Sequence, residues 1–103
     1  MGVVLKKDLL ELCLLQLLCG QDRYGYELIS RLHGGFPDTA ESAVYALLRG
    51  LCREGATESY AGTVSGGPAR KYYHLTDAGA RRLEELLAQW HTLRDTLEGL
   101  GVR

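Results

Sequence analysis

The stretch from Arg70 to Gly79 constrains the fold of this chain more than any other, because a strand pattern runs directly into the start of a helix. Its first part, Arg-Lys-Tyr-Tyr-His-Leu, alternates and is rich in aromatic residues, as strands are. Thr76 follows at once and is a good N-cap, so a long helix is expected from Asp77 to about Glu98. The sequence therefore predicts a strand that returns to the body of the protein and passes straight into the last helix.

Shorter helices are predicted before this strand. Apolar residues recur at helical spacing over about Leu9–Cys19 and Gly25–His33, and glycines follow both segments. A third helix is expected between Pro37 and Gly55, with its apolar residues on one face. Two pairs of residues have the spacing of a capping box, in which side chains satisfy the free N–H groups at a helix start. These pairs are Asp8 with Glu11 and Asp38 with Glu41.

The predicted strand also has a partner. The segments Ala56–Tyr60 and Ala69–Leu75 contain β-branched or aromatic residues with some alternation, and glycines and Pro68 lie between them. This pattern is typical of a hairpin with a glycine-rich tip. The predicted fold class is mainly α with a small β-hairpin. It comprises a winged helix-turn-helix domain over residues 1–76 and a long C-terminal dimerisation helix over residues 77–103, in one compact unit.

A second subunit is expected to cover part of this chain. With 103 residues a single core is marginal, since a chain of this size buries only about two thirds of its unfolded surface. The first predicted helix is apolar almost all round, and the last helix repeats its apolar residues at the spacing of a coiled-coil seam. We therefore expect a homodimer. The predicted interface comprises Leu10, Leu14, Leu83, Leu86, Trp90, Leu93 and Leu97.

The third predicted helix has a polar, basic face opposite its apolar one. Short side chains allow a helix to approach a DNA groove closely, and arginines bond guanine edges or phosphates. The formal net charge of the chain is -1, so DNA would have to meet a local basic surface. The expected DNA-binding residues are Ser42, Tyr45, Arg49 and Arg53 on this helix and Arg70 and Lys71 on the strand.

Several motifs follow one another along the chain. They are Tyr24-Gly25-Tyr26-Glu27-Leu28, Val44-Tyr45-Ala46-Leu47-Leu48-Arg49, Glu54-Gly55, Gly67-Pro68-Ala69-Arg70-Lys71-Tyr72-Tyr73-His74-Leu75-Thr76 and Gly79. In this order they resemble the PadR family over nearly the whole chain. The resemblance implies a homodimeric bacterial repressor with a winged helix-turn-helix domain and, in the short form of the family, a single C-terminal dimerisation helix. The family commonly has glycine, threonine and an aliphatic residue before the tyrosine, whereas Ser42, Ala43 and Val44 precede Tyr45 here.

The resemblance also implies a small planar aromatic effector. Relatives of the short form resemble drug sensors in which an aromatic residue of the last helix stacks on the ligand, and Trp90 is the only tryptophan of this chain. On general grounds a large core residue is the favoured explanation of Trp90. The effector pocket expected from the resemblance is lined by Trp90, Leu86, Leu93, Leu10 and Leu14.

Other kinds of function have little support in the residues. No phosphate loop or nucleophile motif points to an enzyme, and no short Cys or His spacing points to a metal, so no cofactor is expected. The cysteines, Cys13, Cys19 and Cys52, form no close pair, and the apolar run is too short to span a membrane, so we expect a cytoplasmic protein. Two alternatives stay open: a winged-helix protein-interaction module without specific DNA binding, and a repressor that senses oxidation through Cys13 or Cys52.

Overall fold

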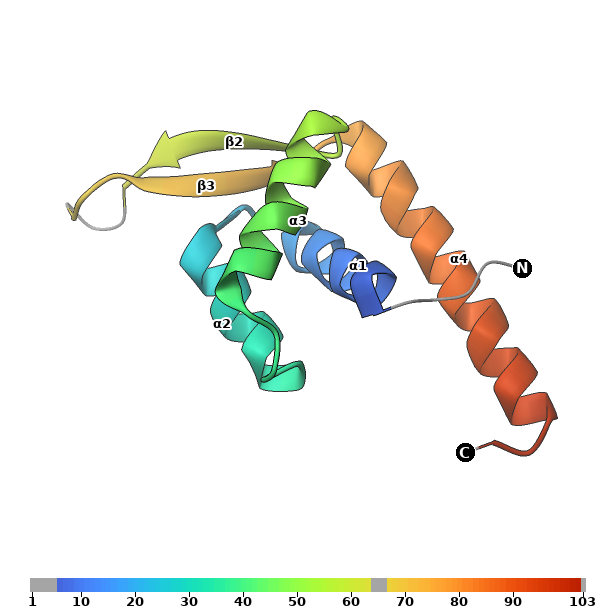
Figure 1. Ribbon diagram of the computed structural model, residues 1–103. Helices are drawn as coiled ribbons and strands as arrows, with labels where there is room; N and C mark the ends of the chain where they lie inside the picture. Colours follow the sequence, from blue (N-terminus) through green and yellow to red (C-terminus); the bar gives the residue numbers. More distant parts are fainter. Residues whose placement is uncertain (1–5, 64–66, 103) are drawn as a thin grey trace.

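The computed structural model of the protein describes residues 6–63 and 67–102 and combines four helices with a small sheet (Figure 1). In chain order the elements are α1 (Lys6–Leu18), β1 (Arg23–Tyr24), α2 (Gly25–Gly35), α3 (Glu41–Arg53), β2 (Thr57–Gly62), β3 (Arg70–Leu75) and α4 (Asp77–Gly99). In Figure 1, β2 and β3 extend to one side of α3, whereas α1 and α4 lie on its other side. The prediction of a mainly helical chain with a hairpin and a long last helix is confirmed.

The two predicted capping boxes are wrong. Asp8 lies inside the first turn of α1, which begins at Lys6, and α3 begins after Ala40 with no side chain bonded at its N-cap. Glu11 does not cap its own helix, because its Oε1 accepts a hydrogen bond from Arg82 Nε at 2.9 Å. A capping box is a local pattern, and here an acidic residue finds a partner from the far end of the chain.

The sheet contains a third strand, β1, that the sequence pattern does not predict. All pairings are antiparallel and the order is β1-β3-β2, so β3 lies in the middle. The predicted hairpin of β2 and β3 is confirmed, while Gly66 of its tip lies outside the described residues. A strand of two residues is too short to show alternation, which is why β1 escapes a periodicity test.

One apolar core joins the helices and the root of the hairpin. It includes Leu10, Leu14, Leu15 and Leu18 of α1, Leu28, Ile29 and Leu32 of α2, Val44, Leu48 and Leu51 of α3, Tyr73 of β3, and Leu83 and Leu86 of α4. The predicted N-cap of α4 is confirmed, because Thr76 Oγ1 accepts a hydrogen bond from the Gly79 N–H at 3.0 Å. The same hydroxyl donates to the carbonyl of Gly55, where the chain turns out of α3 with a φ of 79°.

The second half of α4 projects from this core. Its last buried residue is Leu86, and beyond it Trp90, Leu97 and Leu100 are exposed apolar side chains. The chain is therefore elongated, with a longest dimension of 53 Å. In the part of the chain that the structure describes, none of the helices combines the length and the apolar character that a membrane span requires.

Candidate nucleic-acid interface

The outward face of α3 is polar and basic, as the helical wheel predicts. Ser42, Arg49 and Arg53 are exposed, whereas Val44 and Leu48 are buried in the core. The face has small residues between its cations, so the helix backbone can approach a groove closely. The arginine forks can then reach base edges or phosphates.

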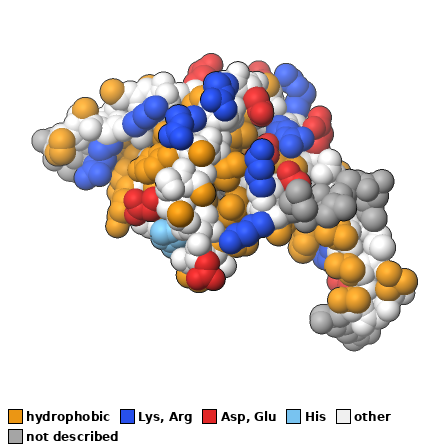
Figure 2. Space-filling view, viewed as in Figure 1, with side chains coloured by type: hydrophobic (Ala, Val, Ile, Leu, Met, Phe, Trp, Pro, Cys, Tyr) orange, Lys and Arg blue, Asp and Glu red, His pale blue; other side chains and the backbone are white. Residues whose placement is uncertain are grey.

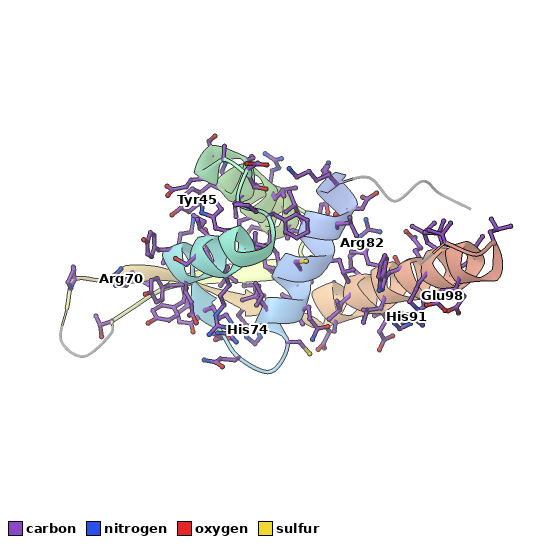
Figure 3. The ribbon with its side chains drawn as sticks, turned by 90° about the horizontal axis from the view of Figure 1, so that it is seen from below. Tyr45, Arg70, His74, Arg82, His91 and Glu98 are labelled. Carbon is purple, nitrogen blue, oxygen red and sulfur yellow. The ribbon has the colours of Figure 1, made fainter. Side chains whose placement is uncertain are left out.

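Tyr45 is placed differently from the other predicted contacts on this helix. It is half-buried and packs against the core. A Cβ built on Gly25 would lie only 3.1 Å from Tyr45 Cε1, so the ring lies directly over the start of α2 (Figure 3). Gly25 therefore leaves the room that Tyr45 needs, and the tyrosine ring joins α2 to α3.

The turn between α2 and α3 is held by a histidine. His33 Nε2 donates to the carbonyl of Thr39 at 2.7 Å, and the Thr39 N–H donates to the carbonyl of Phe36 at 3.1 Å. These bonds fix the chain immediately before α3 begins. The sequence does not predict this role of His33, because its partner is a backbone atom that no side-chain motif reveals.

The hairpin of β2 and β3, hereafter the wing, carries the two remaining predicted contacts. Arg70 Cζ lies 4.9 Å from the centre of the Tyr24 ring, and Lys71 Nζ lies 5.7 Å from the centre of the Tyr73 ring. Tyr72 meets the Tyr24 ring edge-on, with the ring centres 5.7 Å apart. The two cations therefore point to opposite faces of the strand, as the alternation predicts, and aromatic rings hold both of them at the surface.

The distribution of ion pairs explains how a chain of net charge -1 presents a basic surface. Four arginines elsewhere on the molecule are paired with carboxylates, and Arg81 is the exception among the described residues; the four are Arg23, Arg31, Arg82 and Arg94. Within residues 6–63 and 67–102, by contrast, no carboxylate pairs with any cation of α3, the wing or the first turn of α1. These cations are Arg49, Arg53, Arg70, Lys71, Lys6 and Lys7. Figure 2 shows Lys and Arg side chains spread over this face.

A carboxylate at the root of the wing ties both of its strands to the loop before β1. Asp22 accepts a hydrogen bond from the Tyr60 hydroxyl at 2.6 Å and lies 2.8 Å from His74 Nδ1. The bond to Asp22 raises the pKa of His74 above its ordinary value of 6.5, and the same two bonds lower the pKa of Asp22. Glu58 and Asp77 also raise the pKa of His74 by charge.

We expect this contact to make the wing root sensitive to pH. Because the pKa of His74 is higher in the folded chain, the charged bond is fully present below the ordinary pKa and is lost as pH rises through the raised one. NMR titration should show the His74 pKa falling toward its ordinary value in Asp22→Asn. Tyr60→Phe should keep most of the shift, since it removes only the other donor. Equal His74 titration in Asp22→Asn and the wild type would contradict the contact.

The residues predicted for the dimer interface and the effector pocket separate into two groups. Leu10, Leu14, Leu83 and Leu86 are no more than 6% exposed in the single chain, so they have almost no surface left for a partner or ligand. The expectation for these four residues is therefore revised. Trp90 and Leu97 are 36% and 37% exposed and Leu93 is half-buried, so these three lie where a second subunit can reach them.

A groove of about 410 Å³ lies beside Trp90, between α1, the end of α2 and α4. Its lining is mostly apolar and includes Leu12, Cys13, Leu17, Leu32, Phe36, Leu87 and Trp90. Of the predicted pocket residues only Trp90 lines it. The sequence does not show how α1 is rotated about its own axis. Because this helix is apolar almost all round, its pattern does not reveal which face packs inward.

The cysteines and histidines form no metal site in the described ranges, where no group of three potential ligands is placed to hold a metal ion. Burial raises the pKa of the Cys13 thiol, which disfavours the reactive thiolate form. Cys52 Sγ lies 3.1 Å from Thr57 Oγ1, inside the joint between α3 and β2. The burial of Cys13 therefore argues against oxidation sensing at that position.

Comparison with known proteins agrees with this geometry. The model of the PadR-like family of transcriptional regulators matches residues 14–85. A PadR-like transcriptional regulator from Bacillus cereus is 38% identical, with a TM-score of 0.84 over 91% of this chain and 92% of that one. A Streptococcus transcriptional regulator is 32% identical, with a TM-score of 0.86 over 97% and 99% of the two chains. An uncharacterised protein of Lysinibacillus sphaericus is 34% identical and covers 86% of this chain and 84% of its own length.

Proposed function

Because this chain belongs to the PadR-like family of transcriptional regulators, which bind DNA, we propose that it is a homodimeric repressor released from its operator by a small molecule. The observation that carries the proposal is the set of unpaired cations on α3 and the wing. A surface of this kind attracts the phosphate backbone even though the whole chain is slightly acidic. Such a regulator works in the cytoplasm, where bacterial DNA lies.

In the proposed complex, α3 enters the major groove and the wing lies on the sugar-phosphate backbone. Ser42, Arg49 and Arg53 approach the base edges from α3. Arg70 and Lys71 meet phosphates, which fix the position of the protein without reading sequence. Tyr45 acts from behind the helix, where its ring sets the distance between α2 and α3.

The projecting half of α4 supports the proposal of a homodimer. It carries Trp90, Leu93, Leu97 and Leu100 beyond the edge of the core, and a second subunit that covered them would bury apolar surface that the single chain leaves in water. A two-fold symmetric dimer presents two copies of α3 to successive turns of DNA, about 34–36 Å apart. The second subunit thus completes both the apolar surface and the DNA-binding unit.

The groove beside Trp90 supports the proposal of an effector site. It is bordered by the indole and by apolar side chains of α1 and α2, which suits a planar aromatic compound. A ligand that entered between this groove and the partner's α4 would change the angle between the subunits. The spacing of the two α3 helices would then no longer match the operator, and DNA would be released.

The proposal is tested by titrating a labelled duplex from the DNA upstream of the gene with wild type and Leu97→Asp, at two salt concentrations. We expect salt-sensitive, competitor-resistant binding by a wild-type dimer. Leu97→Asp should be monomeric by light scattering and should bind much more weakly, because a charge is placed on the apolar face of α4. Adding a phenolic acid, a planar aromatic anion that does not intercalate into DNA, should change Trp90 fluorescence and release the duplex. A monomeric wild type, or binding equal to that of unrelated DNA, would contradict the repressor.

A further inference from the structure

A second groove lies on the other side of α1, between its first turn and α3. We call it the first-turn groove; its volume is about 610 Å³. Lys6 and Lys7 line it from α1, and Ala43, Ala46 and Arg53 line it from the outward face of α3. It is therefore continuous with the proposed DNA-binding surface and separate from the groove beside Trp90.

The lysines of this groove are in an unfavourable place for the fold alone. The N-terminus of a helix carries a partial positive charge, so cations in a first turn are unfavourable there. Asp8 belongs to the same turn but does not line the groove. In the described part of the chain, Lys6 and Lys7 form no ion pair. The groove does contain Glu11, but that carboxylate is buried and bonded to Arg82 at 2.9 Å. Asp38 and Glu54 are the other carboxylates of its lining, and both are exposed.

The first-turn groove also contains a buried hydroxyl. Thr39 lines the first-turn groove and is 7% exposed. Its Oγ1 is buried and has no hydrogen-bond partner among the residues that the structure describes. Buried hydroxyls in native proteins usually have a partner, so this hydroxyl is unusual, and it lies in the same groove as the unpaired lysines.

The position of the groove indicates which anion Lys6 and Lys7 would meet. A helix is about 10–12 Å across and the major groove of DNA is about 12 Å wide, so a helix in that groove has a phosphate backbone on each side. In Figure 1 the wing extends from one side of α3 and the first turn of α1 lies on the other side. Arg70 and Lys71 of the wing can meet one backbone. The opposite backbone would then face Lys6 and Lys7.

We propose that the first-turn groove seats the second phosphate backbone of the major groove that α3 enters, with Lys6 and Lys7 as its phosphate contacts. This inference rests on the proposed DNA binding and extends it to a surface that faces away from the wing. Phosphate contacts of this kind carry no sequence information but add affinity and fix the tilt of α3. Each contact also releases counterions, so each contributes to the salt dependence of binding.

The test uses duplexes in which one phosphate at a time is replaced by an uncharged methylphosphonate. K6Q/K7Q should lower affinity for the unmodified duplex about tenfold and reduce the salt slope by about 2, since each phosphate contact contributes about 0.9. In wild type, a methylphosphonate at a contacted phosphate should weaken binding. K6Q/K7Q should no longer be weakened by methylphosphonates on one side of the major groove, and R70Q/K71Q should no longer be weakened by those on the opposite side. K6R/K7R keeps the charges and should behave as wild type.

Several results would overturn the inference. The inference would be wrong if every methylphosphonate weakened binding of K6Q/K7Q as much as it weakens binding of wild type. It would also be wrong if K6Q/K7Q and R70Q/K71Q became insensitive to the same methylphosphonates. A general loss of affinity with an unchanged methylphosphonate pattern would show an effect of net charge and no contact. The proposed repressor can be contradicted separately. If wild type binds all sequences equally but K6Q/K7Q is insensitive to methylphosphonates on one side of the groove, the phosphate contacts of Lys6 and Lys7 are supported and operator specificity is contradicted.

Discussion

Arg49→Ala and Arg53→Ala are each expected to weaken operator binding by about 1–3 kcal/mol, which is about fivefold to 150-fold in Kd. Both arginines are exposed on the outward face of α3. Neither forms an ion pair in the described part of the chain, so truncation should remove contacts to DNA without removing contacts of the fold. The thermal unfolding temperature should therefore stay that of wild type. Fluorescence anisotropy and thermal melting measure the two quantities.

Arg81→Ala is the matched control for this pair. Arg81 is also exposed and unpaired among the described residues, but it lies on α4, which belongs to the other side of the molecule from the wing (Figure 1). Arg81→Ala should lower affinity for the operator only slightly, through the change in net charge. Wild-type affinity in both α3 variants, or equal losses in all three proteins, would mean that α3 is not the helix that reads DNA.

Gly79→Ala is expected to destabilise the fold by at least about 3 kcal/mol, the upper part of the range for overpacked sites. A Cβ at this position would lie 2.0 Å from the Ala56 carbonyl oxygen and 2.7 Å from Leu75 Cδ1. The carbonyl cannot move freely, because it accepts the Thr76 N–H at 3.1 Å. The side chain would thus force apart the joint at which β2, β3 and α4 meet. At fixed protein concentration, Tm should fall by more than about 10 °C.

Gly99→Ala is the control for the chemistry of this substitution. It lies in the same helix, and a Cβ there would meet no atom within 4 Å. Alanine is a better helix former than glycine, so this variant should keep or slightly raise Tm. If Gly79→Ala melts like Gly99→Ala, the close packing of α4 against Ala56 is incorrect.

Patterns carried by neighbouring residues were sufficient for much of this fold. The spacing of apolar residues predicts α3 and its exposed arginines, and the alternation of β3 places Arg70 and Lys71 on opposite faces. The N-cap of α4 follows from Thr76 alone. Each of these features depends on residues within one or two turns of a helix, or within one strand, so the sequence is enough to predict it.

Features that join distant residues were missed for a common reason. β1 pairs with β3, Asp22 binds Tyr60 and His74, and Glu11 binds Arg82. Each partner is chosen by where the elements meet in space, and no local pattern records that choice. The same limit explains why the capping box at Glu11 is wrong, since its spacing is correct and its tertiary partner differs.

The residues predicted for an effector pocket and a dimer surface show the limit of what the sequence can predict. Its apolar spacing alone determined that α1 and α4 bury leucines and that the chain has more apolar surface than one small core requires. Only the tertiary structure decided that Leu10, Leu14 and Leu86 lie in the core of the single chain, whereas Trp90 lines a groove. Periodicity specifies that a helix has an apolar face, but the rotation and tilt at which helices pack against one another select which side chains remain accessible.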